Sequence, residues 1–132
     1  MKKSFPILAL VAILLPLLFT ACTNGPGPGG KASIEGVVKG TRYLNNCTTN
    51  AGTFLAEDED VYIIYGDDPS YGDRVKTGPG GVFYFQYLRP GKYTIYAYST
   101  KCTVAQKEAV IMEVEITDKG QALVTDTLRL DK

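Results

Sequence analysis

The chain of 132 residues contains no histidine, no tryptophan and only three cysteines. Without an imidazole base, the usual Ser-His-Asp and Cys-His arrangements of nucleophilic catalysis cannot be built. Isolated cysteines without histidine are also too few ligands for a zinc site. The absence of tryptophan weakens the case for a sugar-stacking platform. We therefore expect a protein that is not an enzyme and that uses no cofactor and no metal centre.

The chain also lacks an excess of either charge, with 14 basic and 14 acidic residues. Lys2 and Lys3 lie in an N-terminal segment that we expect to be removed, so the remaining chain is slightly acidic. Nucleic-acid binding requires a basic surface. We therefore expect no nucleic-acid partner.

The N-terminus reads as an export signal. Two lysines precede the apolar run Phe5 to Phe19, which is about fifteen residues long and therefore short for a membrane span, and Pro16 interrupts it. The following run LLFTAC, which ends at Cys22, resembles the lipobox of bacterial lipoproteins, except that Phe19 stands where the pattern prefers Leu. The resemblance implies a signal peptide over residues 1–21 and fatty acyl chains such as palmitate on Cys22. An uncleaved anchor and an ordinary secretory signal are the alternatives.

Residues 22–30 contain the run TNGPGPGG, whose glycines and prolines predict a tether between membrane and domain. Thr23 follows the cysteine instead of Asp, which under the usual sorting logic for lipoproteins favours the outer membrane. The tether lacks the acidic signal that some lineages use for surface display. We therefore expect a lipid-anchored protein of the cell envelope that faces the periplasm.

Two cysteines remain after Cys22, namely Cys47 and Cys102. In an oxidising compartment, two such cysteines usually form a disulfide. The loop that they would close spans about 55 residues, for which chain entropy predicts a stabilisation of roughly 4 kcal/mol. A metal site is the alternative interpretation, and it lacks ligands.

Residues 31–132 show the alternation of period two that is typical of β-strands and no helical period. Turn residues such as Arg89-Pro90-Gly91-Lys92 separate the apolar segments. The expected strands are Ala32–Lys39, Val61–Tyr65, Val82–Tyr87, Tyr93–Ser99, Val110–Thr117 and Ala122–Leu130, with a short extra one near Arg74–Thr77. This pattern predicts one all-β domain, an antiparallel β-sandwich of about seven strands, with an insertion over residues 41–60.

Three segments, SIEGVV, VYIIY and TGPGGVFYFQYLRPGKYTIYAYS, resemble the carboxypeptidase-regulatory-like domains of the prealbumin-like (transthyretin-like) fold. The positions in register with that family pattern are Thr77, Gly81, Phe83, Phe85, Leu88, Pro90, Gly91, Tyr93 and Ile95. The resemblance covers roughly residues 33–99 and implies the sandwich. It implies little about function, because this fold carries unrelated activities.

Strand alternation divides the aromatic residues into two sets. The predicted core consists of Phe83, Phe85, Tyr93, Ile95 and Ala97, joined by Val61, Ile63, Ile34 and Val38. The opposite parity leaves a candidate partner surface of Tyr62, Ile64, Tyr84, Tyr96 and Tyr98. Outward tyrosines could anchor a protein partner or stack on a glycan. They could equally be ordinary sheet residues under a loop, for which the insertion over residues 41–60 is a candidate.

A run of carboxylates over residues 57–60, followed by Asp67, Asp68 and Asp73, raises the possibility of calcium binding. Its spacing matches no standard calcium loop, and such runs are usually solvated surface.

The leading interpretation is a membrane-anchored accessory lipoprotein that binds another envelope protein. The alternative is a glycan-binding module of a polysaccharide-handling system.

Overall fold

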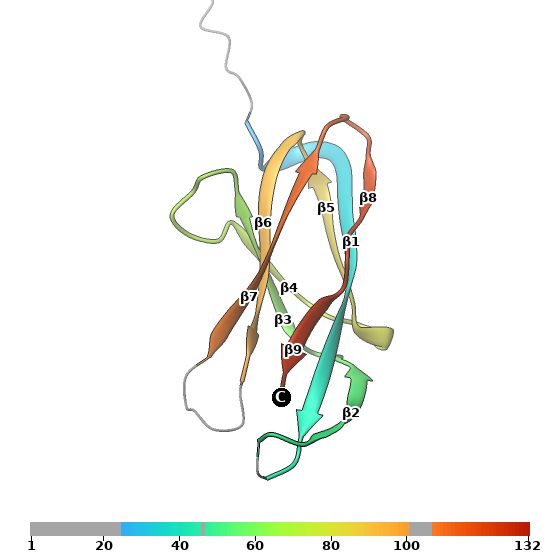
Figure 1. Ribbon diagram of the computed structural model, residues 1–132. Coiled ribbons are helices and arrows are strands. Elements are labelled where there is room, and N and C mark those ends of the chain that lie inside the picture. Colours follow the sequence, from blue (N-terminus) through green and yellow to red (C-terminus); the bar gives the residue numbers. More distant parts are fainter. Residues whose placement is uncertain (1–24, 46, 101–106) are drawn as a thin grey trace, which may run out of the picture.

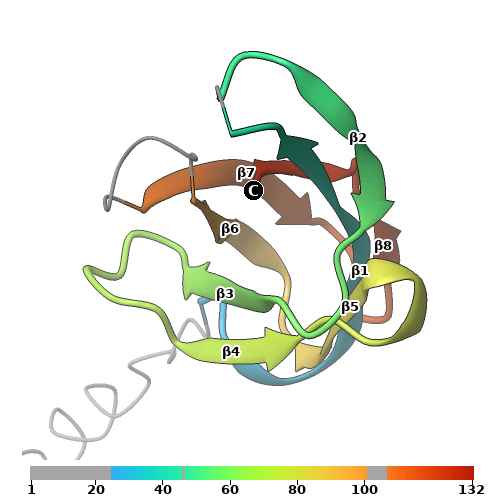
Figure 2. The same ribbon diagram turned by 90° about the horizontal axis from the view of Figure 1, so that it is seen from below.

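The computed structural model describes residues 25–45, 47–100 and 107–132. The predicted signal peptide, Cys22 and Cys102 lie outside these residues. Two β-sheets face each other across one apolar core, as seen from the side in Figure 1 and along the strands in Figure 2. The prediction of an all-β sandwich is confirmed. In the described part of the chain, no helix is long and apolar enough to cross a membrane.

One sheet has five strands and is organised around the long strand β1 (Pro28–Tyr43). Strands β2 (Asn50–Leu55) and β5 (Val82–Leu88) pair with β1 in the antiparallel sense. Strands β8 (Ala122–Val124) and β9 (Leu128–Asp131) pair with it in parallel. Each half of β1 thus has two partner strands, which makes it the centre of this sheet.

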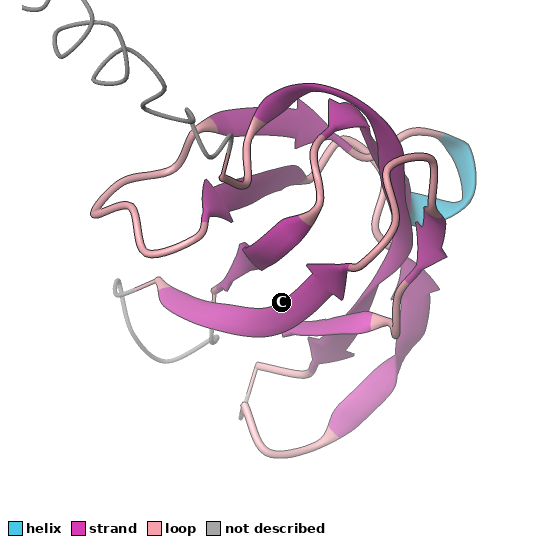
Figure 3. Ribbon diagram, turned by 90° about the horizontal axis from the view of Figure 1, so that it is seen from above, coloured by secondary structure: helices cyan, strands magenta, loops and turns pink. Residues whose placement is uncertain are grey.

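The other sheet is antiparallel throughout and has the strand order β4-β3-β6-β7. Its strands are β3 (Asp60–Tyr65), β4 (Asp73–Lys76), β6 (Gly91–Ser99) and β7 (Glu108–Ile116). Between β4 and β5 lies η2 (Pro79–Gly81), a single turn of 3-10 helix that stands out from the strands in Figure 3.

The core contains every residue that the alternation placed there. All nine predicted core positions are buried, and they are joined by Ala32, Ala56, Leu88, Ile116, Leu128 and Leu130. Because successive side chains of a strand point to opposite faces, burying one parity leaves the other parity outside. The inner faces of both sheets are therefore apolar, and candidate binding residues lie on the two outer faces.

The structure explains why glycine stands at position 81 and threonine at position 77, two positions of the pattern described above. Gly81 has φ +70°, and a Cβ atom on it would lie 2.5 Å from the carbonyl oxygen of Val38, so only glycine fits this turn. The buried hydroxyl of Thr77 donates to the Ala56 carbonyl at 2.6 Å and accepts the backbone N–H of Glu59 at 2.9 Å. Thr77 therefore ties the entry of β3 to the end of β4.

The structure differs from the sequence prediction in three places. It describes nine strands instead of about seven, because residues 41–60 extend β1 and form β2 and the expected strand Ala122–Leu130 is divided into β8 and β9. The insertion consequently widens the five-stranded sheet. Within the expected tether, Gly27 is buried and β1 begins at Pro28, because Gly27 N–H donates to the Tyr93 hydroxyl at 2.9 Å.

Candidate functional site

The outer face of the four-stranded sheet carries most of the predicted partner surface. Tyr62 and Ile64 lie on β3, while Tyr96 and Tyr98 lie on the neighbouring strand β6. The register places Tyr62 directly opposite Tyr96. Side chains opposite each other on one face of an antiparallel pair are close enough to interact. These residues therefore form one continuous surface.

Four tyrosine rings contact one another on this face, and we call Tyr62, Tyr71, Tyr96 and Tyr98 the tyrosine cluster. The rings of Tyr62 and Tyr96 are stacked, with centroids 5.0 Å apart and planes 10° from parallel. Tyr71 and Tyr98 meet Tyr62 edge to face at centroid distances of 5.1 and 5.7 Å. Such geometries are favoured by the ring quadrupole. The rings partly bury one another. This burial is the main cause that raises the pKa of Tyr96, and the neighbouring Tyr98 raises it further.

Tyr71 was not predicted from the sequence. It lies in the connection between β3 and β4, where strand alternation gives no information about direction. Its ring is 51% exposed, and it packs on Tyr62 from outside the sheet. The run Gly66-Asp67-Asp68-Pro69 in the sequence indicates only a turn in this segment.

Charged residues border the tyrosine cluster on the β4 side. A side-chain hydrogen bond to Tyr62, and then the nearby Asp60 carboxylate, raise the pKa of Arg74. Oδ1 of Asp60 is buried and accepts no hydrogen bond from the described residues. Arg74 Nε and Lys76 Nζ lie 3.8 and 3.9 Å from that oxygen, within ion-pair range and beyond hydrogen-bond distance. Two cations thus balance the charge of this buried oxygen at the edge of the cluster.

On the β7 side, the register continues the surface. Ile111 lies opposite Tyr96 and is 61% exposed, so one row across the sheet runs from Arg74 through Tyr62 and Tyr96 to Ile111. The next row joins Ile64, Thr94 and Glu113. Aromatic and aliphatic side chains therefore occupy the middle of the face, and charges lie at its edges.

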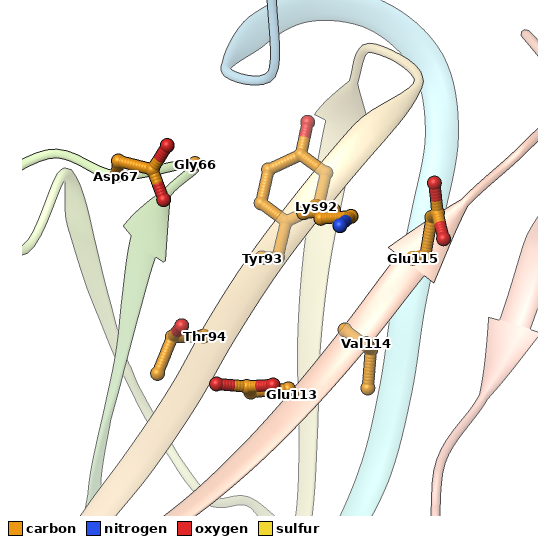
Figure 4. Close-up of a pocket in the computed structure, with 8 residues that line it drawn as sticks. All are labelled: Gly66, Asp67, Lys92, Tyr93, Thr94, Glu113, Val114 and Glu115. Atoms are coloured by element: carbon orange, nitrogen blue, oxygen red, sulfur yellow. The ribbon is translucent and has the colours of Figure 1, made fainter.

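A groove of about 390 Å³ adjoins the row of Ile64, Thr94 and Glu113, and we call it the acidic groove (Figure 4). It is lined by Gly66, Asp67, Lys92, Tyr93, Thr94, Glu113, Val114 and Glu115. Asp67 lies on the β3 side and the two glutamates lie on β7, so three carboxylates surround the groove together with Lys92. Thr94 and Glu113 belong to both the groove and the sheet face, which makes the two surfaces continuous.

The structure separates Tyr84 from the other four predicted surface residues. Tyr84 lies on β5, on the outer face of the five-stranded sheet, and it is 44% exposed. Its partner across the strand pair is Glu35, and in the described part of the chain no aromatic ring packs on it. Sequence parity showed that Tyr84 points outward, but it could not show which sheet Tyr84 occupies.

The acidic residues do not form a metal site in the described structure. Among the residues that are described, no group of three or more His, Cys, Asp or Glu side chains is placed to hold a metal ion. Several of the carboxylates that were weighed as calcium ligands have other partners. Lys76 pairs with Asp58 at 3.1 Å, Lys132 pairs with Glu59 at 2.6 Å, and Glu57 accepts the N–H of Gly80 at 2.9 Å.

Cys47 lies in the turn between β1 and β2, and Cys102 lies outside the described residues. Nearby backbone bonds bring the two chain segments to one place. Tyr43 N–H donates to the Lys132 carbonyl at 3.3 Å, and Thr100 N–H donates to the Asp131 carbonyl at 3.0 Å. The ends of β1 and β6 therefore both lie beside the end of β9, and the Cys47–Cys102 disulfide stays a prediction.

No protein-family model matches the chain, and no curated protein matches it. A search of solved structures found a crystal structure of a proposed carbohydrate-binding protein from Pseudomonas aeruginosa. The two chains share 13% sequence identity over 100% of each chain, with a TM-score of 0.48. A likeness at this level carries no argument about what the present chain binds.

Proposed function

We propose that this chain is a non-enzymatic binding module, held at a bacterial envelope membrane by an acylated Cys22. It binds another envelope protein through the outer face of the four-stranded sheet. The anchor rests on the lipobox-like run that ends at Cys22, and the absence of histidine supports a role without catalysis. The resemblance of residues 33–99 to carboxypeptidase-regulatory-like domains supports membership of that group.

The tyrosine cluster is the observation that carries the protein-binding proposal. Interface hot spots are enriched in tyrosine and arginine, with a less critical polar rim around them. Tyr71 and Ile111 supply exposed apolar area, and Arg74 stands beside Tyr62. The rings are already held against one another, so little side-chain freedom remains to be lost on binding.

A site-specific crosslink tests this proposal in the intact, lipidated protein. A photoreactive phenylalanine analogue would replace Tyr71 in one variant and Tyr84 in a matched variant. The two tyrosines are similarly exposed, at 51% and 44%, but they lie on opposite outer faces. We expect one defined protein adduct in cells from position 71 and none from position 84. Equal adducts from both positions, or none from position 71, would contradict the assigned face.

The acidic groove favours glycan binding as the second candidate. Carboxylates and a lysine can accept from and donate to sugar hydroxyls, while tyrosine rings offer apolar faces for stacking. The groove and the cluster share one surface through Thr94 and Glu113, which suits an extended ligand. Envelope polysaccharides retained by the parent protein and lost by both Tyr71→Ser and Glu113→Gln would favour this candidate. Retention by both variants would exclude this face as the glycan site.

The proposed location is the outer membrane, because Thr23 and not Asp follows Cys22, and its periplasmic side, because the tether lacks an acidic signal for surface display. A Cys22→Ser variant should leave the membrane fraction, and labelled palmitate should no longer be incorporated. Continued acylation of that variant would refute the anchor.

For the disulfide, mass spectrometry without reductant should find Cys47 joined to Cys102 in exported protein, whereas two free thiols would refute it.

A further inference from the structure

The start of the described chain and the β5–β6 and β7–β8 turns lie at one end of the sandwich (Figure 1). Residues of these segments line a second pocket. Its volume is about 390 Å³, and we call it the basic pocket. It is lined by Gly29, Gly30, Lys31, Arg89, Pro90 and Lys119. Three of these six residues are cationic and none is acidic. An arrangement of this kind is suited to an anion.

The Arg89 guanidinium is held in place by the first described residues. Arg89 Nε donates to the Gly25 carbonyl at 2.8 Å, and a Cβ atom on Gly27 would lie 3.0 Å from the Nη2 atom of the guanidinium. A guanidinium always carries its charge and presents its N–H groups in a planar fork that matches phosphate oxygens. Because its stem is already fixed, Arg89 needs little further ordering to bind an anion.

The other cations come from two separate segments of the chain. Lys31 lies where the pairing of β1 with β5 shifts register between Pro28 and Ala32. At the adjacent Gly30 a Cβ atom would lie 1.8 Å from the Leu88 carbonyl oxygen, so β1 crosses this turn closely. Lys119 lies in the β7–β8 turn, next to Asp118, the nearest acid in sequence. The folded chain thus gathers three cations that are distant in the sequence.

An exposed aromatic residue lies two positions before Arg89. Tyr87 has φ +58°, a backbone conformation that is uncommon for a non-glycine residue, and its side chain is 70% exposed. The strain persists because Phe85 and Leu88 on either side are both buried and must face the core. The ring of Tyr87 is therefore held away from the core at the end of the molecule that carries the basic pocket.

We propose that this end of the sandwich rests on the membrane, where the basic pocket binds the phosphate group of an anionic phospholipid and Tyr87 enters the headgroup layer. This inference rests on the acylated Cys22 of the proposed function. Three residues of chain span at most about 10 Å, so Gly25 cannot lie far from the acylated cysteine. Tyrosine is favoured where one end of a side chain is apolar and the other is wet, as at a membrane interface.

The charge distribution at this end also gives the domain an orientation. The acidic groove, with Asp67, Glu113 and Glu115, is repelled by an anionic lipid surface, while the basic pocket is attracted to it. The domain is therefore expected to tilt so that the basic pocket is nearest the lipid. The tyrosine cluster, which is continuous with the acidic groove, then remains accessible to a partner.

Vesicle co-sedimentation tests the proposal independently of the lipid anchor and of the tyrosine cluster. The protein would be the chain from residue 22 with Cys22→Ser, which contains every described strand. Vesicles of phosphatidylcholine alone would be compared with vesicles that also contain phosphatidylglycerol, at low and at high salt. We expect binding only to the anionic vesicles, weakened by salt because the contact is electrostatic.

The decisive variant is Lys31→Gln combined with Lys119→Gln, because both lysines are exposed and the substitutions should not affect folding. Each lysine contributes about fivefold to the affinity for the anionic vesicles, so the double variant should lose roughly 25-fold. Lys107→Gln combined with Arg129→Gln is the control of equal charge change at exposed positions elsewhere, and it should retain binding. Tyr87→Ser should weaken binding, and Tyr84→Ser should not.

Each other outcome overturns the assignment. Equal losses in the test and control variants would show that only net charge matters. Inorganic phosphate that shifts the amide resonances of Gly29 and Gly30, without any vesicle binding, would assign the pocket to free phosphate. If the protein responds neither to vesicles nor to phosphate, the assignment of the basic pocket as an anion site is wrong. None of these results bears on the crosslink from position 71, so the two proposals fail separately.

Discussion

The two outer faces of the sandwich present different side chains to solvent. On the four-stranded sheet, the register places Tyr62 opposite Tyr96, with Ile111 beyond it. On the five-stranded sheet, the corresponding row runs from Tyr84 through Glu35 to Val124. Aromatic side chains opposite each other pack together, whereas a charged residue between two apolar ones keeps them apart. One face therefore holds a ring cluster, and the other holds separate exposed side chains.

The comparison shows that exposure alone does not identify a binding surface. Tyr84 is 44% exposed and Tyr87 is 70% exposed. The three cluster tyrosines that lie on strands are less exposed, because each is half-buried. The half-buried rings are the ones whose position is held by neighbours. A held aromatic surface can bind with a smaller loss of side-chain entropy.

The largest effects should be equal for the two sheets. Ile95 on β6 and Ile34 on β1 are both completely buried. Ile95→Ala and Ile34→Ala should each lower the free energy of unfolding by about 2–5 kcal/mol, because each leaves a cavity in the shared core. Urea denaturation would measure both values. A large cost at only one position would mean that the two faces do not rest on one core.

The next effect concerns the end of the four-stranded sheet. The Tyr93 hydroxyl donates to the Arg89 carbonyl at 2.5 Å and accepts Gly27 N–H at 2.9 Å. Tyr93→Phe leaves that buried N–H unpaired and should cost about 1–3 kcal/mol. Ile116→Val nearby is a control for packing, with an expected cost of about 0.5–1.5 kcal/mol. An unchanged free energy of unfolding in Tyr93→Phe would show that this link is dispensable.

Tyr93 also makes stability depend on alkaline pH. Burial raises the pKa of Tyr93 above its usual value of 10.0, as it does for Tyr65 and Tyr96. The folded state therefore holds these protons more tightly, so the stabilisation is complete below pH 10.0 and is lost as pH rises through the folded pKa values. Urea denaturation at increasing pH should show this decline. It should be shallower in Tyr93→Phe, and an identical slope would contradict the assignment.

A smaller effect distinguishes the two faces directly. Tyr96→Leu removes a stacked and an edge-to-face ring contact and should cost about 0.5–1.5 kcal/mol. Tyr84→Leu removes no ring contact and should stay within about 0.5 kcal/mol. Thermal or urea unfolding of the pair gives the comparison. Equal costs would mean that the cluster contributes nothing beyond the area that it buries.

Much of the burial pattern could be predicted from the sequence. The alternation over residues 82–88 and 93–99 predicted Phe83, Phe85, Tyr93 and Ile95 as core, and all four are buried. The composition of the continuous sheet face was harder to predict. Tyr71 lies in a turn without periodicity, and alternation places Tyr84 on an outer face without saying that it belongs to the other sheet. The basic pocket was not predicted, since Lys31, Arg89 and Lys119 meet only through contacts between distant turns.

The sequence by itself determined which side of each strand is buried, because a strand alternates its side chains and apolar ones leave water. It also determined that no imidazole chemistry is available. Only the tertiary structure decided that Tyr62 and Tyr96 stack while Tyr84 stands apart. Every strand offers backbone N–H and C=O groups whatever its side chains, so the choice of neighbours depends on how the two sheets close over one core.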